Sequence, residues 1–330
     1  MSVYPRVKAS DLFTPAELDR VRHASDALGV LCVAHAWGVI AGAMALTAWQ
    51  WWLAPLAFIV IGSRQLGLAI LMHDAAHGIL TKSKRLNDFL GQWFLAYPVF
   101  TDLVPYRVYH LKHHRSTQQP DDPDLELSKH FPITRESFRR KLIRDITGQT
   151  GYQQRKAAFA SVIKRGQWAT LAGWLATNAV ILAACIAAGF WWLYPVLWLG
   201  PMLTWFQVIV RVRNIAEHAV VPDNNDPFRN ARTTIANPLA RALLAPYWVN
   251  YHVEHHLLFW VPCYRLPLMH RMLKAKGITA RMEVRPGYFD VIRQATSRPS
   301  GTGGIQGGRG LRRRNEMLEG APTGDVPATS

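Results

Sequence analysis

The sequence predicts an all-α, polytopic membrane protein with four transmembrane helices in two hairpins and a cytosolic helical cap. Three observations support this fold class. The 330-residue chain is 49% apolar and contains 13 tryptophans, a residue type that gathers at membrane interfaces. Two long stretches carry no charged side chain, and most of the histidines fall into short clusters just beyond the helices predicted there. The cap is expected to hold these histidine clusters.

The first uncharged stretch covers residues 27–63. One membrane span takes about 20 apolar residues, so this stretch is long enough for most of two helices. We expect spans at residues 27–46 and 51–71, with a polar and aromatic turn at residues 47–50. Arg64 falls late in the second span, where its long side chain reaches the headgroups or faces the bundle interior.

The second uncharged stretch covers residues 168–210 and predicts spans at 168–188 and 191–210. Gly189 lies between them, followed directly by three aromatic residues that are typical of a membrane interface. A pair of helices in a soluble core is the alternative, but core helices rarely stay uncharged for so long.

The distribution of Lys and Arg predicts the orientation. Both hairpin tips lack these residues, whereas the segment between the hairpins and the segment after the fourth span are rich in them. The positive-inside rule then places both termini and the active site in the cytoplasm, at the inner membrane if the chain is bacterial. Residues 89–100 are apolar but short and contain Pro98, so we expect an interfacial or re-entrant segment there.

Three segments are expected along the chain. Residues 1–26 form a cytosolic N-terminal segment without a cleavable signal, residues 27–295 form the membrane domain with its cap, and residues 296–330 form a disordered tail rich in Gly, Pro and Arg. The net charge of +16 is unevenly distributed, and no nucleic-acid-binding motif accompanies it. We therefore expect membrane lipid, and no nucleic acid, among the partners. The three cysteines are too far apart to form a metal-binding pair.

The histidines form three compact motifs that indicate a metal site. The motifs are His73 with His77, His110 with His113 and His114, and His252 with His255 and His256. Residues three or four apart share a helix face, so each motif presents at least two imidazoles together. Neutral imidazole binds iron, copper, zinc or nickel, and eight histidines are about right for two ions.

Further candidates lie near these motifs. His218 follows the fourth span and is a candidate ninth ligand, with Asn214 four residues before it; a surface histidine is the alternative. Metal-bound imidazoles commonly donate their other N–H to a carboxylate, and six acids lie close in sequence: Asp74, Asp121, Asp122, Asp124, Glu217 and Glu254. Of these we select Asp74, Asp124 and Glu254, together with Asn214, as supporting residues. His35 is expected to face the bundle, and His23, His130 and His270 the surface.

These motifs resemble the three histidine boxes of the membrane fatty acid desaturase superfamily. The resemblance runs from about the second span to Pro267, and the segment NYHVEHHLLFWVPCYRLP is similar to the third box of bacterial acyl-lipid desaturases. It implies four long transmembrane helices under a cytosolic cap, two non-haem iron ions, O2 as co-substrate and two electrons from an outside donor. The stearoyl-CoA desaturase branch has an asparagine and a histidine four residues apart after its fourth span. Asn214 and His218 match them, which implies contact of Asn214 with a metal through water.

The first box departs from that branch because three residues separate His73 from His77 instead of four, so an acyl-CoA substrate does not follow. The same box also resembles that of the carotenoid ketolases. Three functions therefore stay open: a desaturase acting on a fatty acyl chain, a hydroxylase or ketolase acting on a carotenoid or other lipid, and a non-enzymatic transporter or metal-binding membrane protein. A transporter would place ionisable residues near the bilayer midplane, which these clusters avoid.

The chemistry requires an external reductant. An unactivated methylene group has no acidic proton, so its oxidation depends on metal and dioxygen. The sequence shows no flavin, haem or iron–sulfur motif, and we expect a separate carrier such as a ferredoxin with its reductase. The basic residues that an acidic carrier would meet are Lys82, Lys84, Arg85, Arg139, Arg140, Lys141 and Arg144. These residues could equally contact anionic lipid headgroups.

Overall fold

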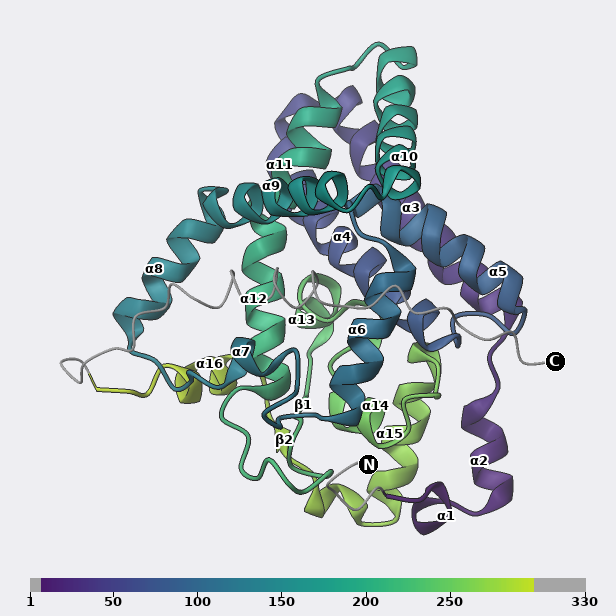
Figure 1. Cartoon of the computed structure of the whole chain (residues 1–330), viewed down its shortest axis with the longest axis vertical. Coiled ribbons are helices and arrows are strands. Elements are labelled where there is room, and N and C mark those ends of the chain that lie inside the picture. The colour runs from purple at the N-terminus through teal and green to yellow at the C-terminus, as the bar shows by residue number, and fades with distance from the viewer. Residues whose placement is uncertain (1–6, 300–330) are drawn as a thin grey trace.

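The computed structural model of the chain describes residues 7–299 and is built almost entirely of helices (Figure 1). The longer helices are α2 (Pro15–Arg22), α3 (Asp26–Trp49), α4 (Ala54–His77), α6 (Leu103–Arg115), α8 (Arg135–Ile146), α9 (Gln149–Lys164), α10 (Trp168–Ala187), α12 (Trp205–His218), α15 (Leu266–Ala275) and α16 (Tyr288–Ala295). The shorter ones are α1 (Ala9–Leu12), α5 (Lys84–Phe89), α7 (Leu125–Ser128), α11 (Gly200–Leu203), α13 (Pro238–Leu243) and α14 (His252–Leu257). Strands β1 (Thr233–Thr234) and β2 (Val284–Arg285) form one short parallel pair. The all-α prediction is confirmed.

Within the described residues, four helical segments are long and apolar enough to cross a membrane, as predicted. They cover Asp26–Trp49, Trp51–His77, Trp168–Ala187 and Tyr194–His218. The second and fourth segments continue beyond the predicted spans 51–71 and 191–210, to His77 and His218. This extension carries candidate metal ligands on the same helices that cross the membrane.

Helix α4 is the central element of the bundle. Nearly every residue from Ile61 to Ala76 is buried, on all sides of the helix. Helices α3, α6 and α12 pack against it. Two glycines allow this close packing, because a Cβ at Gly62 would lie 2.7 Å from the Trp205 ring and one at Gly67 would lie 2.8 Å from the Tyr247 ring. A helix surrounded in this way holds its C-terminal histidines in a fixed position.

The fourth apolar segment is interrupted. It begins with the π-helical turn η4 (Tyr194–Leu199), continues as α11, and breaks at Thr204 before α12 starts. Pro195 and Pro201 cannot donate backbone hydrogen bonds, which favours such irregularity. Side chains compensate, since Gln207 Nε2 donates to the Met202 carbonyl at 2.9 Å. Irregular backbone within an apolar segment is tolerated where its polar groups find partners within the protein.

The apolar segment at residues 89–100 does not form a fifth span. It contains the π-helical η2 (Leu90–Ala96) and the short 3-10 turn η3 (Tyr97–Val99), which pack against α4 and α10. Asn178 Nδ2 donates to the Pro98 carbonyl at 3.4 Å, and Trp174 Nε1 donates to the Thr101 carbonyl at 2.9 Å.

The N-terminal helices close the end of the molecule opposite α10 and α11 (Figure 1). Leu12, Phe13 and Val21 form an apolar cluster with Val253 and Met269. This cluster supports α14, which carries the third histidine motif, from below. Residues 1–6 and 300–330, which include nearly all of the tail predicted to be disordered, lie outside the described residues.

The packing of α9 on α11 gives a first prediction. A Cβ at Gly151 would lie 2.3 Å from the Leu203 carbonyl oxygen, a backbone atom that cannot move cheaply. We expect Gly151→Ala to lower the free energy of unfolding by about 1–3 kcal/mol through overpacking. Gly42→Ala is the control, because nothing lies within 4 Å of its Cβ position. Thermal melting in detergent measures both, and equal melting temperatures would contradict this packing.

Candidate metal centre

Nine histidines from four helices meet in two groups. The first group contains His73, His77, His110, His114 and His255, and the second contains His113, His218, His252 and His256. Within each group the potential ligand atoms all lie within 4.8 Å of one another. The structure thus brings together all nine histidines that the sequence singled out.

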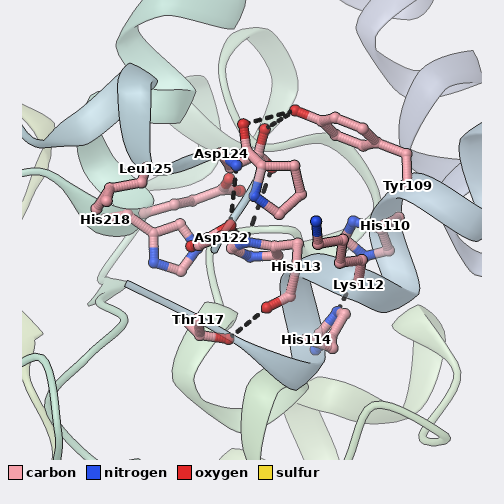
Figure 2. A network of polar contacts seen from close by, with 12 residues as sticks. Tyr109, His110, Lys112, His113, His114, Thr117, Asp122, Asp124, Leu125 and His218 are labelled. Atoms are coloured by element: carbon pink, nitrogen blue, oxygen red, sulfur yellow. Dashed lines mark hydrogen bonds and ion pairs between the residues drawn. The ribbon is translucent and has the colours of Figure 1, made fainter. Parts of the chain in front are cut away.

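Helix geometry explains how the motifs contribute. With 3.6 residues per turn, position i+4 lies about 40° from position i on one side and position i+3 about 60° on the other, so the side chains at i+3 and i+4 point about 100° apart. On α6, His110 and His114 therefore enter the first group while His113 enters the second, as Figure 2 shows for the three rings. On α14, His252 and His256 enter the second group and His255 enters the first. Each H-x-x-H-H motif is divided between two groups.

The facing atoms are the Nε2 nitrogens. In the first group, Nε2 of His114 lies 2.9 Å from that of His110 and 3.0 Å from that of His255. In the second, Nε2 of His252 lies 2.9 Å from that of His218 and 3.1 Å from that of His256. Two nitrogens that each bind an ion at about 2.1 Å, at right angles, lie about 3.0 Å apart. The spacing therefore fits one metal ion in each group.

Unsatisfied polar atoms support the same fit. His73 Nε2 and both ring nitrogens of His77 are buried without a hydrogen-bond partner. Leaving buried polar atoms unpaired costs about 1–3 kcal/mol each, so native proteins rarely do so without a reason. A metal ion would use the lone pairs that the protein leaves free.

The Nδ1 atoms have partners of their own. His113 Nδ1 lies 2.8 Å from Asp122 Oδ1, His218 Nδ1 lies 3.1 Å from the Asn230 carbonyl, and His256 Nδ1 lies 3.3 Å from the Thr117 hydroxyl. Such partners fix the orientation of each ring and direct Nε2 toward the ion.

Asp122 is itself held rigidly by the loop that follows α6. Its two carboxylate oxygens accept backbone N–H groups, from Gln118 at 2.7 Å and from Asp124 at 2.8 Å. The turn-rich sequence after the second motif thus folds an acid back under the site (Figure 2).

Burial favours the neutral form of the imidazoles. Burial, followed by the charges of neighbouring histidines, sets the pKa of five ring systems well below the usual value: His110, His114, His252, His255 and His256. His113 differs. Burial is the largest single influence and lowers the pKa of its ring, but the hydrogen bond to Asp122 and the charges of Asp124, Asp122 and Glu217 together outweigh it, so the pKa is raised. Neutral rings are the form that binds a metal.

A small cavity of about 40 Å³ adjoins the second group. Its walls include Tyr106, Asn214 and Glu217 beside the metal-facing histidines. A water molecule needs roughly 10–15 Å³ of such volume, so the cavity has room for water or dioxygen but not for a lipid chain.

The comparisons with known proteins agree with this geometry. The model of the fatty acid desaturase family matches residues 17–286. The chain belongs to the fatty acid desaturase family. It is therefore an oxidoreductase, and its four apolar helices make it a membrane protein, as this family predicts.

Relatives in the family include desaturases and ketolases. The chain is 31% identical to dihydrorhizobitoxine desaturase of Bradyrhizobium elkanii, over 80% of this chain and 78% of that protein. It is 25% identical to sn-1 oleoyl-lipid 12-desaturase of Anabaena variabilis, over 71% and 72% of the two chains. It is 27% identical to a beta-carotene ketolase of a Paracoccus species, over 74% and 92%.

The predicted supporting residues occupy different positions. Asp74 Oδ1 lies 3.4 Å from His73 Nδ1, and its Oδ2 accepts the Cys263 N–H at 2.7 Å. Asp124 accepts the Tyr109 hydroxyl at 2.5 Å, and its nearer oxygen is 3.9 Å from His113 Nδ1. Asn214 lines the cavity beside the second group.

Glu254 lies away from the ligand atoms. Its carboxylate contacts the Thr233 hydroxyl and His270 Nδ1 instead, because on α14 position 254 faces away from 252, 255 and 256. Glu217, which is not among the predicted supporting residues, has a carboxylate oxygen 3.5 Å from His252 Nδ1. Its position next to His218 was the available signal.

Other residues went unrecognised in the sequence. Asp122 is not among the predicted supporting residues, because nothing in the local sequence distinguishes it from Asp124. The Tyr106 ring stacks on His110 with centroids 5.4 Å apart, which its spacing of four residues could have suggested. The contacts of Asn230 and Thr117 carry no sequence signal at all.

The remaining histidines stay outside both groups. His23 is exposed beside Asp19, and His130 lies 3.6 Å from Glu126. His270, expected at the surface, is only 13% exposed and contacts Glu254. His35, expected to face the bundle, is exposed by area, although its Nδ1 lies 3.0 Å from the Tyr247 hydroxyl.

The Asp122–His113 contact gives the second prediction. We expect Asp122→Asn to weaken divalent metal binding by about 10–100-fold, because the ring of His113 loses its charged partner. Asp121→Asn is the matched control, since Asp121 is adjacent and exposed. Metal titration of the purified proteins measures the effect. Equal affinities of the two variants would contradict the role of Asp122.

Proposed function

We propose that the protein binds two non-haem iron ions, one in each histidine group, and uses O2 to introduce a double bond into a fatty acyl chain. The observation that carries this proposal is the pair of adjacent all-histidine groups with Nε2 atoms at metal-binding spacing. The reaction consumes O2, two electrons and two protons, removes two hydrogen atoms from adjacent carbons and yields two water molecules. Bound iron would supply, with O2, an oxidant strong enough to break an unactivated C–H bond.

The chain's own residues hold and orient this centre. Nine imidazoles provide the ligands, and Asp122, Glu217 and the Asn230 carbonyl fix ring orientations. Asn214 would contact the second ion through a water in the adjoining cavity. Six of the nine histidines are buried, and this excludes bulk water from the reacting atoms.

A hydroxylase or ketolase is the second candidate. Its specific support is the similarity to a beta-carotene ketolase over most of both chains. The histidine set serves both outcomes, because the reactions diverge only after the first hydrogen atom is removed. The non-enzymatic alternative has no comparable support, since the relatives named above are desaturases and a ketolase.

We also propose the membrane arrangement that the sequence predicts. The four spans form two hairpins, residues 27–295 form one membrane domain, and the metal-binding cap and both termini face the cytoplasm. Exposed tryptophans at the predicted tips support this, with Trp49 75% and Trp51 76% exposed near one tip and Trp191 63% exposed near the other.

The electrons come from a separate carrier in this proposal. An acyl-lipid omega-3 desaturase of Synechocystis, 28% identical over 31% of this chain, carries ferredoxin in its name. A ferredoxin with its reductase is therefore the donor we propose.

Product analysis tests the function. Purified protein with ferredoxin, its reductase, NADPH and cellular lipid should yield products two mass units lighter than the substrate. Products sixteen units heavier would favour the oxygenase. Mass spectrometry of the lipids distinguishes the two outcomes. Turnover with NADPH alone, without a carrier, would contradict the proposed electron source.

Iron analysis tests the site. We expect about two iron ions per chain, by the ligand count of the two groups. His252→Ala should lose the iron of the second group and retain that of the first, because it removes one of four ligands. His23→Ala is the control, since His23 is exposed directly after α2. Unchanged iron content in His252→Ala, measured by elemental analysis, would disprove the assignment.

A further inference from the structure

Helices α8 and α9 extend sideways from the bundle (Figure 1). One side of this helix pair is fixed to the protein. Arg211 Nη2 donates to Asp145 Oδ1 at 2.8 Å, Thr150 donates to the same oxygen at 2.6 Å, and Gly151 packs on the Leu203 backbone. The opposite side is exposed.

The exposed side is more apolar than a water-facing surface requires. Ile143 is 48% exposed, Ile146 49%, Tyr152 62% and Ile163 50%. Helix α9 ends at Lys164, four residues before α10 begins at Trp168, which is 62% exposed. The apolar exposure thus continues directly from a membrane span onto α9 and α8.

The same helices are strongly basic. Residues 135–164 contain eight Lys or Arg and two acids, and one of the acids, Asp145, is already paired with Arg211. Arg135, Arg139, Arg140 and Arg144 are all exposed on α8. Burial and the positive charges of Arg211 and Arg144 lower the pKa of Lys141, so this region holds more cations than the protein neutralises.

The basic residues do not form one face. Lys84 and Arg85 begin α5, which lies at the edge of the molecule opposite α8 (Figure 1). The basic residues of α5 and α8 therefore face different parts of the surface. Exposed isoleucines among arginines, on helices that lead into a span, are typical of a helix lying in the membrane surface.

We propose that α8 and α9 lie in the plane of the membrane surface and bind anionic lipids. Ile143, Ile146 and Ile163 enter the acyl-chain boundary, and the arginines of α8 bind the phosphates. Because Arg211 ties α8 to α12, the lipids would brace the helix that carries Asn214 and His218.

Lipid titration in nanodiscs tests the charge component without requiring turnover, so its outcome is independent of the proposed reaction. The full chain in phosphatidylcholine should gain thermal stability as phosphatidylglycerol is added. Each basic residue near an anionic surface contributes about 1 kcal/mol, roughly a five-fold change in binding. The triple variant Arg139→Gln, Arg140→Gln, Arg144→Gln should therefore bind phosphatidylglycerol on the order of 100-fold more weakly and lose the gain.

Two further variants keep the charge test decisive. Arg20→Gln, Arg271→Gln, Lys274→Gln removes three exposed cations at the end of the molecule opposite α10 and should retain the gain. Arg→Lys at positions 139, 140 and 144 keeps the charge and should retain it as well. A gain that survives the α8 Gln variant, or is lost equally in the distant variant, would overturn the proposal.

Photo-crosslinking tests the placement. Phosphatidylglycerol with a diazirine in its acyl chain should label the peptide containing Ile143 and Ile146, as well as α10, but not α2 or α15. Labelling of α10 without α8 would overturn the in-plane position.

An unchanged lipid response in the Arg139, Arg140, Arg144 Gln variant, combined with a raised KM for ferredoxin, would overturn the proposal and assign this surface to the electron carrier.

Discussion

The crowding of nine imidazoles is the interaction on which the rest of this structure depends. Their Nε2 atoms point toward one another at distances near 3 Å, and those of His73 and His77 are buried without a hydrogen-bond partner. Neutral nitrogens in such an arrangement repel one another through their lone pairs unless a cation lies between them. The bundle must therefore be rigid enough to hold the rings together before the ion is bound.

That rigidity comes from helices that serve two purposes. Helices α4 and α12 are parts of membrane-crossing segments and also carry His73, His77 and His218 at their cytoplasmic ends in the proposed orientation. Helices α6 and α14 each supply ligands to both groups, so they join the two sites as well as complete them. A displacement of either helix would disturb both groups together. Dense packing around α4 limits such displacements, because α6 packs directly against it.

Two features beside the histidine groups also affect their function, namely the small cavity and the helix pair α8 and α9. The cavity beside the second group has a volume of about 40 Å³, which is room for water or dioxygen but not for a lipid chain. The proposed in-plane helices α8 and α9 anchor α12 from outside through the Arg211–Asp145 pair. Helix α12 would then be contacted by α8, pack in the bundle and carry His218. A change in the lipid contacts of α8 or in the packing of α12 would therefore alter the position of His218.

Much of this could be predicted from the sequence, because the relevant signals are local. Uncharged length predicts the four spans, and helical spacing predicts that His110 and His114, or His252 and His256, face one way. Tertiary structure alone decided which ligands share an ion, since that depends on where α4, α6, α12 and α14 cross. It also decided that Asp122 and Glu217 support the rings while Glu254 contacts His270, and that α5 and α8 separate the basic residues. Helical periodicity relates side chains within one helix, but only packing relates one helix to another.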